Sequence, residues 1–169
     1  MKERYCIAFA GVPGSSKTPI AYYLSEQLDL PIFSSDSIRT EVKEDVGWFD
    51  IAEFDRRREA RLRDQVSRGR SFIHDSSLDR QWVTFKAELT SASYEQFVIS
   101  IDLSRPFLEK LYRVKGYSMA ELDNYLADHE QFLKGYSQDV GLHITDKEFS
   151  NRLQLAAETV RQWLTKEEK

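Results

Sequence analysis

Cysteine is almost absent from this sequence. The only one, Cys6, lies inside a short apolar run near the start of the chain. A single thiol cannot form a disulfide within the chain, so a disulfide-stabilised framework is excluded and a reducing, cytoplasmic setting is expected. Histidine is sparse as well, with three residues scattered at positions 74, 129 and 143. They show none of the His and Cys spacings that are typical of metal sites.

Long hydrophobic runs are also missing. The charged residues at the start are followed only by an apolar stretch from Ala8 to Pro13, which is too short for a secretory signal or a membrane-spanning segment. The net charge of −4 lacks the basic excess that a large nucleic-acid-binding face needs, although a local basic groove stays open. The catalytic patterns G-x-S-x-G and G-x-G-x-x-G do not occur.

Repeats, low-complexity segments and interdomain linkers are absent too. The 169 residues, with 41% hydrophobic and 31% charged side chains, have the size and composition of an ordinary globular protein with a real core. We therefore expect residues 1–169 to form a single domain.

The most informative stretch that is present runs from Gly11 to Thr18, with the sequence Gly-Val-Pro-Gly-Ser-Ser-Lys-Thr. It follows an apolar run and precedes a helical pattern, which is the layout of a phosphate-binding P-loop. Backbone N–H groups and the helix N-terminus would bind the phosphates, Lys17 would reach the β- and γ-phosphates, and the Thr18 hydroxyl would ligate Mg²⁺. The residues expected to bind ATP are Gly11, Pro13, Gly14, Ser15, Ser16, Lys17 and Thr18.

One residue departs from the usual G-x-x-x-x-G-K-[ST] pattern, because Ser16 stands where glycine normally precedes the lysine. We expect the chain to be turning into right-handed helix at Ser16, so that a small serine is tolerated with some loss of phosphate affinity. Pro19 is tolerated because first-turn N–H groups have no partner within a helix. The alternative is a Gly/Pro/Ser turn that only links a strand to a helix.

Downstream, apolar strand-like runs alternate with helical patterns. Strands are predicted at 5–10, 32–34, 71–75, 97–102 and 141–145, and helices at 16–28, 34–42, 47–68, 79–90, 106–114, 119–133 and 149–164. This alternation predicts a parallel sheet covered by helices on both faces. Ligands bind beyond the carboxyl ends of such strands, where residues 11–18, Asp36 and Asp75 converge.

The helical stretch at 47–68 interleaves basic and acidic residues, with a run of arginines between 56 and 63. We interpret it as a solvated helix face, and the alternative is that one or two arginines bind an anionic substrate. Trp48 and Phe49, just before it, are interpreted as packing residues, with a substrate-stacking role as the alternative.

Three segments together resemble a known group. They are Gly11-x-Pro13-Gly14-x-x-Lys17-Thr18, the segment 30–39 with its Asp36-x-x-Arg39, and Ile73-x-Asp75. The sequence resembles the small P-loop kinases that include the polynucleotide 5′-hydroxyl kinases, zeta toxins, chloramphenicol phosphotransferases and gluconate kinases. The resemblance implies a three-layer α/β P-loop NTPase fold with a parallel sheet in the order 2-3-1-4-5. It also implies Mg-ATP-dependent phosphoryl transfer to a hydroxyl of a small acceptor.

The resemblance gives Asp36 the role of accepting the proton of the acceptor hydroxyl, as a carboxylate can do when the new bond forms. Asp36 could instead be a helix N-cap. Arg39, one helical turn later, can lie on the same face and would hold an anionic group of the substrate. Its alternative is a salt bridge to Asp36 or Glu41.

Asp75 resembles the carboxylate at the end of the group's third strand. It would orient either a Mg²⁺-bound water or a substrate hydroxyl, and the sequence does not choose between them. Its neighbour His74 points to the opposite face on strand alternation and is expected to be structural. Arg80 matches a frequent arginine of the group and is assigned to the substrate.

The segment at about 110–124 takes the place of the group's small helical lid, which supplies cations that close over the transferred phosphoryl group. Arg113 is the preferred catalytic cation, because the lid motif has an arginine just before the break to glycine. Lys110 and Arg105 are less favoured, and each of these cations could be an ordinary exposed helix residue.

Taken together, the sequence predicts a kinase that transfers the γ-phosphate of ATP to a hydroxyl of a small molecule, with Lys17, Asp36 and Arg113 as catalytic residues. A polynucleotide 5′-hydroxyl kinase is the first alternative, and nucleic acid as a partner is disfavoured by the net acidity. A non-catalytic nucleotide-binding switch is the second alternative, kept open by Ser16. The sequence carries no pattern that names the acceptor or the oligomeric state.

Overall fold

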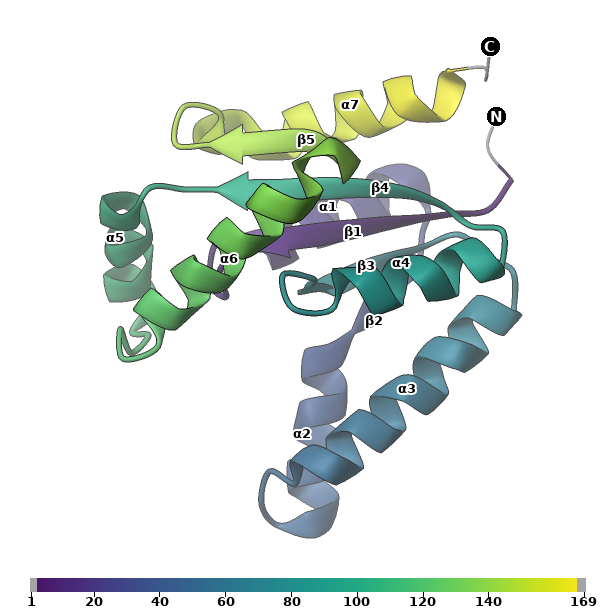
Figure 1. The fold of residues 1–169 in the computed structure, drawn as a ribbon, viewed down its shortest axis with the longest axis horizontal. Helices are drawn as coiled ribbons and strands as arrows, with labels where there is room; N and C mark the ends of the chain where they lie inside the picture. The colour runs from purple at the N-terminus through teal and green to yellow at the C-terminus, as the bar shows by residue number, and fades with distance from the viewer. Residues whose placement is uncertain (1–2, 167–169) are drawn as a thin grey trace.

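The computed structural model describes residues 3–166 and has a central parallel sheet of five strands in the order β2-β3-β1-β4-β5 (Figure 1). The predicted fold class and strand order are confirmed. The strands are β1 Tyr5–Gly11, β2 Ile32–Ser34, β3 Phe72–Ser77, β4 Glu95–Asp102 and β5 Val140–Thr145. No helix within residues 3–166 combines the length and apolar character needed to cross a membrane.

Helices connect the strands in the expected alternation. They are α1 Lys17–Leu28, α2 Ser35–Val46, α3 Ile51–Ser67, α4 Trp82–Ser91, α5 Arg105–Lys115, α6 Leu122–Tyr136 and α7 Arg152–Thr165, with short 3₁₀ turns η1 Ser137–Asp139 and η2 Phe149–Asn151. The element order agrees with the prediction, while several ends shift by a few residues, as is usual for helix termini.

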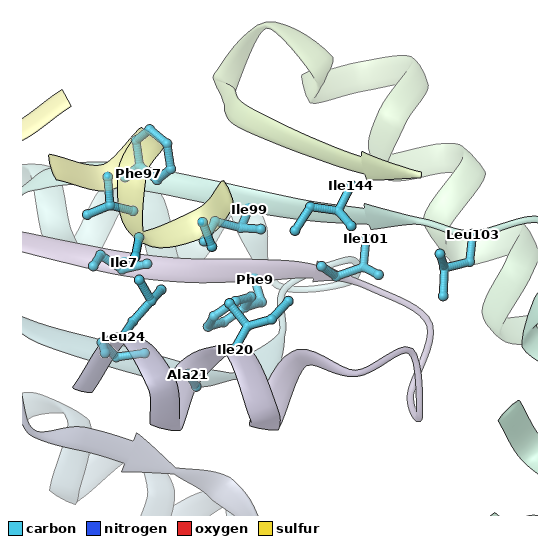
Figure 2. Packing of buried hydrophobic residues seen from close by; sticks show 14 of the residues in the cluster. Ile7, Phe9, Ile20, Ala21, Leu24, Phe97, Ile99, Ile101, Leu103 and Ile144 are labelled. Atoms are coloured by element: carbon cyan, nitrogen blue, oxygen red, sulfur yellow. The ribbon is translucent and has the colours of Figure 1, made fainter. Parts of the chain in front are cut away.

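The central strand β1 divides the interior into two layers by its side-chain alternation. Ile7 and Phe9 point toward α1 and α7 and belong to the larger hydrophobic cluster. Figure 2 shows their packing against Ile20 and Leu24 of α1, with isoleucines of β4 and β5 alongside. Full burial of a side chain such as Phe9 contributes about 1.5–3 kcal/mol, so this layer fixes α1 and the loop before it.

The opposite face of β1 is covered by α4 and α6. Cys6, Ala8 and Ala10 point into this second cluster, where small side chains let the helices approach closely. Cys6 is fully buried, and burial raises the pKa of its thiol well above the ordinary value. The cysteine is therefore a packing residue with little thiolate at neutral pH.

Helices α2 and α3 form an arm that extends away from the sheet (Figure 1). The turn between them uses Gly47 at φ 90°, and the Asp50 carboxylate accepts the N–H of Glu53 to start α3. Most of the arginines of α3 pair with acidic neighbours, as Arg57 does with Glu41 on α2. This arrangement agrees with the interpretation of a solvated, charge-balanced face.

Trp48, at the turn of the arm, does not pack as predicted. Its exposed fraction is 64%, because the turn projects beyond the cluster that Phe49 joins. Phe49 does pack, with its ring 5.5 Å from that of Phe54 on α3.

The ladder between β1 and β3 is irregular at the carboxyl end. Ala8 pairs with His74, but the next residue, Phe9, pairs with Ser77. Asp75 and Ser76 therefore leave the ladder with β1, although Asp75 stays aligned with Ser34 of β2. This irregularity places Asp75 beside the loop that follows β1.

Candidate active site

The P-loop, residues 11–18, joins β1 to α1 in a conformation that depends on its glycines. Gly11 has φ 139° and Gly14 has φ 82°, values that favour glycine. The Gly11 N–H donates to Asp79 Oδ1 at 3.0 Å, and its carbonyl accepts from Ser77 Oγ at 2.9 Å. The first turn of the loop is thus tied to the segment after β3.

The Lys17 side chain folds back into the loop. Its Nζ donates to the carbonyl oxygens of Gly11 at 2.9 Å and Val12 at 2.7 Å. A longer contact of 3.4 Å joins Nζ to Ser15 Oγ. Burial lowers the pKa of Lys17 to about 8, although the nearby carboxylate of Asp79 opposes this shift. A desolvated ammonium whose hydrogen-bond partners are neutral oxygens is well suited to bind a strong anion.

The prediction for the conformation of Ser16 is wrong. Ser16 has φ 86° and ψ 28°, in the left-handed region, and α1 begins only at Lys17. A residue with a Cβ pays on the order of 1 kcal/mol for this conformation, whereas glycine does not.

Thr18 and Asp75 meet at the mouth of the loop. The Thr18 hydroxyl donates to both carboxylate oxygens of Asp75, at 3.2 Å and 3.0 Å. Burial raises the pKa of Asp75, and the hydrogen bond from Thr18 opposes the shift. The two side chains offer hard oxygen atoms next to the phosphate loop, a donor set that suits Mg²⁺.

A cleft of about 800 Å³ lies between the P-loop, the start of α2 and the end of α5. Its lining residues come from four parts of the chain and are Pro13, Gly14, Ser16, Lys17, Thr18, Pro19, Ser35, Asp36, Arg39, Asp75, Ser76, Ser77, Lys115, Tyr117 and Tyr125. The structure therefore brings the predicted nucleotide-binding residues together with Asp36, Arg39 and Asp75.

Asp36 is exposed to this cleft in the first turn of α2, where Ser34 rather than Asp36 occupies the N-cap position. Beside it, the hydroxyl of Ser35 is buried and has no hydrogen-bond partner among residues 3–166. Buried hydroxyls normally have partners, so this atom in the cleft wall marks a place where a bound molecule can supply one.

The Arg39 guanidinium stacks on aromatic rings of the arm, 4.3 Å from the centroid of Phe49 and 5.1 Å from that of Phe54. It forms no ion pair with any carboxylate in the described part of the chain, so neither alternative partner, Asp36 nor Glu41, holds it. An unneutralised cation that lines a cleft can bind an anionic ligand.

The corner between α5 and α6, residues 116–121, covers the loop from the other side. Tyr112 donates from its hydroxyl to the carbonyl of Pro13, and Lys115 Nζ donates to the carbonyl of Gly14 at 2.6 Å. A Cβ atom on Gly14 would lie only 2.9 Å from the Tyr112 ring. The segment 110–124, for which a lid role is predicted, consists of the end of α5, this corner and the start of α6, and it touches the loop directly.

Two predicted site residues lie outside the cleft. Arg113 is on the exposed side of α5 and pairs with Glu109 at 3.8 Å, and Lys115 lines the cleft instead. Arg80 pairs with Asp128 of α6 and lines a separate hollow of about 330 Å³ between α3 and α4. Neither guanidinium therefore lines the cleft at the P-loop.

His74 lies on the opposite face of β3 from Asp75, as predicted. It is buried, stacks on Phe33 with a centroid separation of 5.6 Å, and also contacts Phe85. Burial lowers the pKa of His74 to about 3, so the ring is neutral at physiological pH. Its place in the second cluster supports a structural role.

Sequence reasoning missed a chain of polar contacts behind the loop. His129 of α6 lies between Asp79 and Asp102, and His143 of β5 contacts the other oxygen of Asp102 at 2.5 Å. Asp79 also accepts the N–H of Gly11, so the chain ends on the P-loop. No local pattern could have found it, because its members come from four separate segments.

A second residue that was missed is Arg152, the first residue of α7. Its Nε donates to Ser16 Oγ at 2.9 Å, across a sequence separation of 136 residues. The only signal in the sequence was that Ser16 stands where the motif has glycine, and a serine has a hydroxyl that can bond to a distant residue.

No family model matches the sequence, and no curated protein matches it. Several solved structures do match its fold. One is a gluconokinase from Sinorhizobium meliloti 1021, with a TM-score of 0.68, 14% identity, and coverage of 96% of this chain and 95% of that chain. The chain has the fold of the small P-loop kinases.

Two further structures support this fold assignment. The APS kinase of Mycobacterium tuberculosis, in complex with AMPPNP and APS, matches with a TM-score of 0.65 and 14% identity over 98% of this chain and 100% of that chain. The shikimate kinase of Acinetobacter baumannii, in complex with shikimate, matches with a TM-score of 0.61 and 18% identity over 99% of this chain and 97% of that chain. At such identities the shared property is the fold, and the chemistry must be argued from the site.

Proposed function

We propose that this protein is an ATP-dependent phosphotransferase that moves the γ-phosphate to a hydroxyl of a small molecule. The observation that carries the proposal is the single cleft in which a P-loop faces Asp36 and Arg39. A phosphate-binding loop alone supports only nucleotide binding. A carboxylate opposite that loop can prepare a second substrate, which is what a kinase requires.

The nucleotide side of the cleft is built to bind polyphosphate. None of the hydrogen bonds found within residues 3–166 uses the backbone N–H groups of Gly14 or Ser16. These donors, the Lys17 ammonium and the N-terminus of α1 would bind phosphate oxygens. Lys17 would exchange its carbonyl partners for the β- and γ-phosphates.

The residues present fit a magnesium ion. Thr18 and Asp75 supply neighbouring oxygen atoms at the loop, and Mg²⁺ usually takes only one or two protein oxygens beside phosphates and waters. The bound ion would neutralise charge on the transferred phosphoryl group. Thr18 would ligate it, and Asp75 would orient the Thr18 hydroxyl or a water.

The acceptor side is formed by the start of α2 and the arm. Asp36 would accept the proton of the acceptor hydroxyl, and the buried Ser35 hydroxyl lies next to it. Arg39, whose guanidinium lies 4.3 Å from the centroid of the Phe49 ring, would bind an anionic group of the acceptor. Lys115 would supply the cation from the lid in this arrangement, and Arg113 would contribute only if the lid turns when it closes.

The nucleic-acid alternative finds little support in the arm. Most of its arginines are paired with acidic neighbours: Arg56 with Glu53, and both Arg57 and Arg61 with Glu41. Among the described residues, only Arg39 and Arg63 of the arm's arginines form no ion pair with a carboxylate. Neutralised arginines do not form the basic groove that a polynucleotide needs.

The test is a panel of acceptors with Mg-ATP, scored for ADP release above the background without acceptor. The panel includes sugar acids, polyols, nucleosides and a 5′-hydroxyl oligonucleotide, and Lys17→Ala is the control for the P-loop. We expect a small hydroxyl compound to raise ADP release in the wild type and not in the control. A response to the oligonucleotide alone would favour the polynucleotide kinase. Tight ATP binding with no response to any acceptor would favour the switch.

A further inference from the structure

Arg152 occupies an unfavourable position for a cation. It is the first residue of α7, a helix with no acidic residue in its first turn, where the helix dipole disfavours positive charge. The placement therefore needs a compensating interaction. The structure shows two such interactions, one made by Nε of the guanidinium and one made by Nη1.

The guanidinium of Arg152 is fixed by three contacts. Nε donates to Ser16 Oγ at 2.9 Å, Nη1 donates to the carbonyl of Phe149 at 2.9 Å, and the group lies 4.1 Å from the centroid of the Phe149 ring. Phe149 in turn packs on Phe107 of α5, with ring centroids 4.7 Å apart. The contacts to Phe149 thus hold the Arg152 guanidinium in place independently of its hydrogen bond to Ser16.

Ser16 is the residue that needs such an anchor. It replaces the glycine of the P-loop pattern, holds a left-handed conformation at φ 86°, and is only 6% exposed. A serine left to itself prefers other backbone regions, which would turn its N–H away from the loop interior. The side-chain oxygen of Ser16 accepts a hydrogen bond from Arg152, and this bond can restrain the backbone conformation of Ser16.

We propose that Arg152 is a positioning residue that replaces the missing glycine of the motif. By holding Ser16 Oγ, it keeps Ser16 in the left-handed conformation that a glycine would adopt without help. The loop N–H groups then stay directed at the phosphate site. The inference rests on the proposed function in one respect, because the phosphate site is taken to bind a nucleotide.

The surroundings agree with this role. Arg152 forms no ion pair with a carboxylate among the described residues, so it is not placed there to neutralise one. Lys115 lies close enough that the Arg152 charge helps burial to lower the pKa of Lys115. Two cations beside one loop repel each other, and their closeness is reasonable only where geometry or a bound anion compensates.

The test is a double-mutant cycle read by the dissociation constant of Mg-ADP. Arg152→Ala should weaken binding about five- to tenfold in the wild-type background, the equivalent of one lost hydrogen bond. In the Ser16→Gly background, where no anchor is needed, the same change should cost less than about twofold. Arg161→Ala is the matched control: it removes an arginine from the same helix whose partner is Gln27, and it should leave affinity unchanged.

Equal losses in both backgrounds would overturn the inference, because Arg152 would then act independently of Ser16. If Arg152→Ala does not fold, Arg152→Met keeps the apolar stem against Phe149 and replaces it in the cycle. Thermal unfolding of the same four proteins without nucleotide gives a second readout. Arg152→Ala should lower the Tm less in the Ser16→Gly background than in the wild-type background, whether or not the protein binds nucleotide. If this difference in Tm is found but the wild type binds no nucleotide, the proposed function is overturned and the Ser16–Arg152 pairing stands.

Discussion

Nδ1 of His129 lies 3.1 Å from Oδ1 of Asp79, the same carboxylate oxygen that accepts the backbone N–H of Gly11. On the other side of the ring, Nε2 lies 2.8 Å from Asp102 Oδ1. Both ring nitrogens can donate to carboxylates only when the imidazole is charged. A buried, charged histidine on α6 therefore supports the first turn of the P-loop.

This relationship predicts a pH dependence of stability. Burial disfavours the charged ring, but the hydrogen bonds to Asp102 and Asp79 outweigh it and raise the pKa of His129 to about 9. In an unfolded chain the pKa is about 6.5, so the folded state binds the proton more tightly. The stabilisation is complete below about pH 6.5 and is lost as the pH rises through about 9.

We expect the stability advantage of the wild type over His129→Gln to shrink by on the order of 2–3 kcal/mol between pH 6 and pH 10, as measured by urea unfolding. Lys17, whose pKa is lowered to about 8, has the opposite sign: its penalty is relieved as the pH rises from about 8. Both proteins keep Lys17, so its contribution cancels in the difference. An advantage that stays constant over this range would contradict a charged His129.

Asp36→Asn should separate binding from turnover. The amide keeps the shape of the side chain but cannot accept the proton, so turnover with the best acceptor should fall about 10²- to 10⁴-fold. The Kd of Mg-ATP should stay within about twofold, because Asp36 comes from α2 and forms no hydrogen bond to the loop in the described structure. Isothermal titration and a coupled ADP assay give the two quantities. Undiminished turnover would remove Asp36 from the proposed mechanism.

Thr18→Val should impair the use of magnesium. The change removes the hydroxyl that contacts Asp75 and keeps the side-chain shape, so the Mg²⁺ concentration for half-maximal activity should rise about tenfold or more. Thr18→Ser keeps the hydroxyl and is the matched control. If the valine and serine variants show the same Mg²⁺ dependence, Thr18 is not a metal ligand.

Lys115 and Arg113 can be compared directly. Lys115→Ala should lower kcat about tenfold or more, since it removes the cation that contacts the loop at Gly14. Arg113→Ala should change kcat less than about twofold, because Arg113 pairs with Glu109 on the exposed side of α5. The reverse ranking would mean that the lid rotates on closure and brings Arg113 inward.

The sequence allowed the fold, and the convergence of several candidate residues on one cleft, to be predicted for identifiable reasons. The P-loop, Asp36 and Asp75 each follow an apolar run, and the carboxyl ends of parallel strands meet at one edge. Those residues converge on one cleft, as predicted. The strand order came from the resemblance to the small P-loop kinases, because periodicity alone does not order strands.

Other features could not be predicted, for specific physical reasons. Residues 113 and 115 differ by about 200° around a helix, so Lys115 lines the cleft in this structure and Arg113 does not, and the motif does not fix that phase. The sign of φ at Ser16 depends on where the loop joins the helix, and none of the neighbouring residue types indicates that position. Arg152 is invisible to any local pattern because its partner is 136 residues away.

The complete burial of Cys6 has a practical side. A thiol with a raised pKa and no solvent contact reacts slowly with maleimides and other thiol reagents. One engineered cysteine at Ser118, in the exposed corner between α5 and α6, can therefore carry a fluorophore without prior removal of the native thiol. Trp48, 64% exposed at the far end of the arm, is one of three tryptophans, so a Trp48→Phe variant isolates its contribution to the intrinsic fluorescence as a second optical signal.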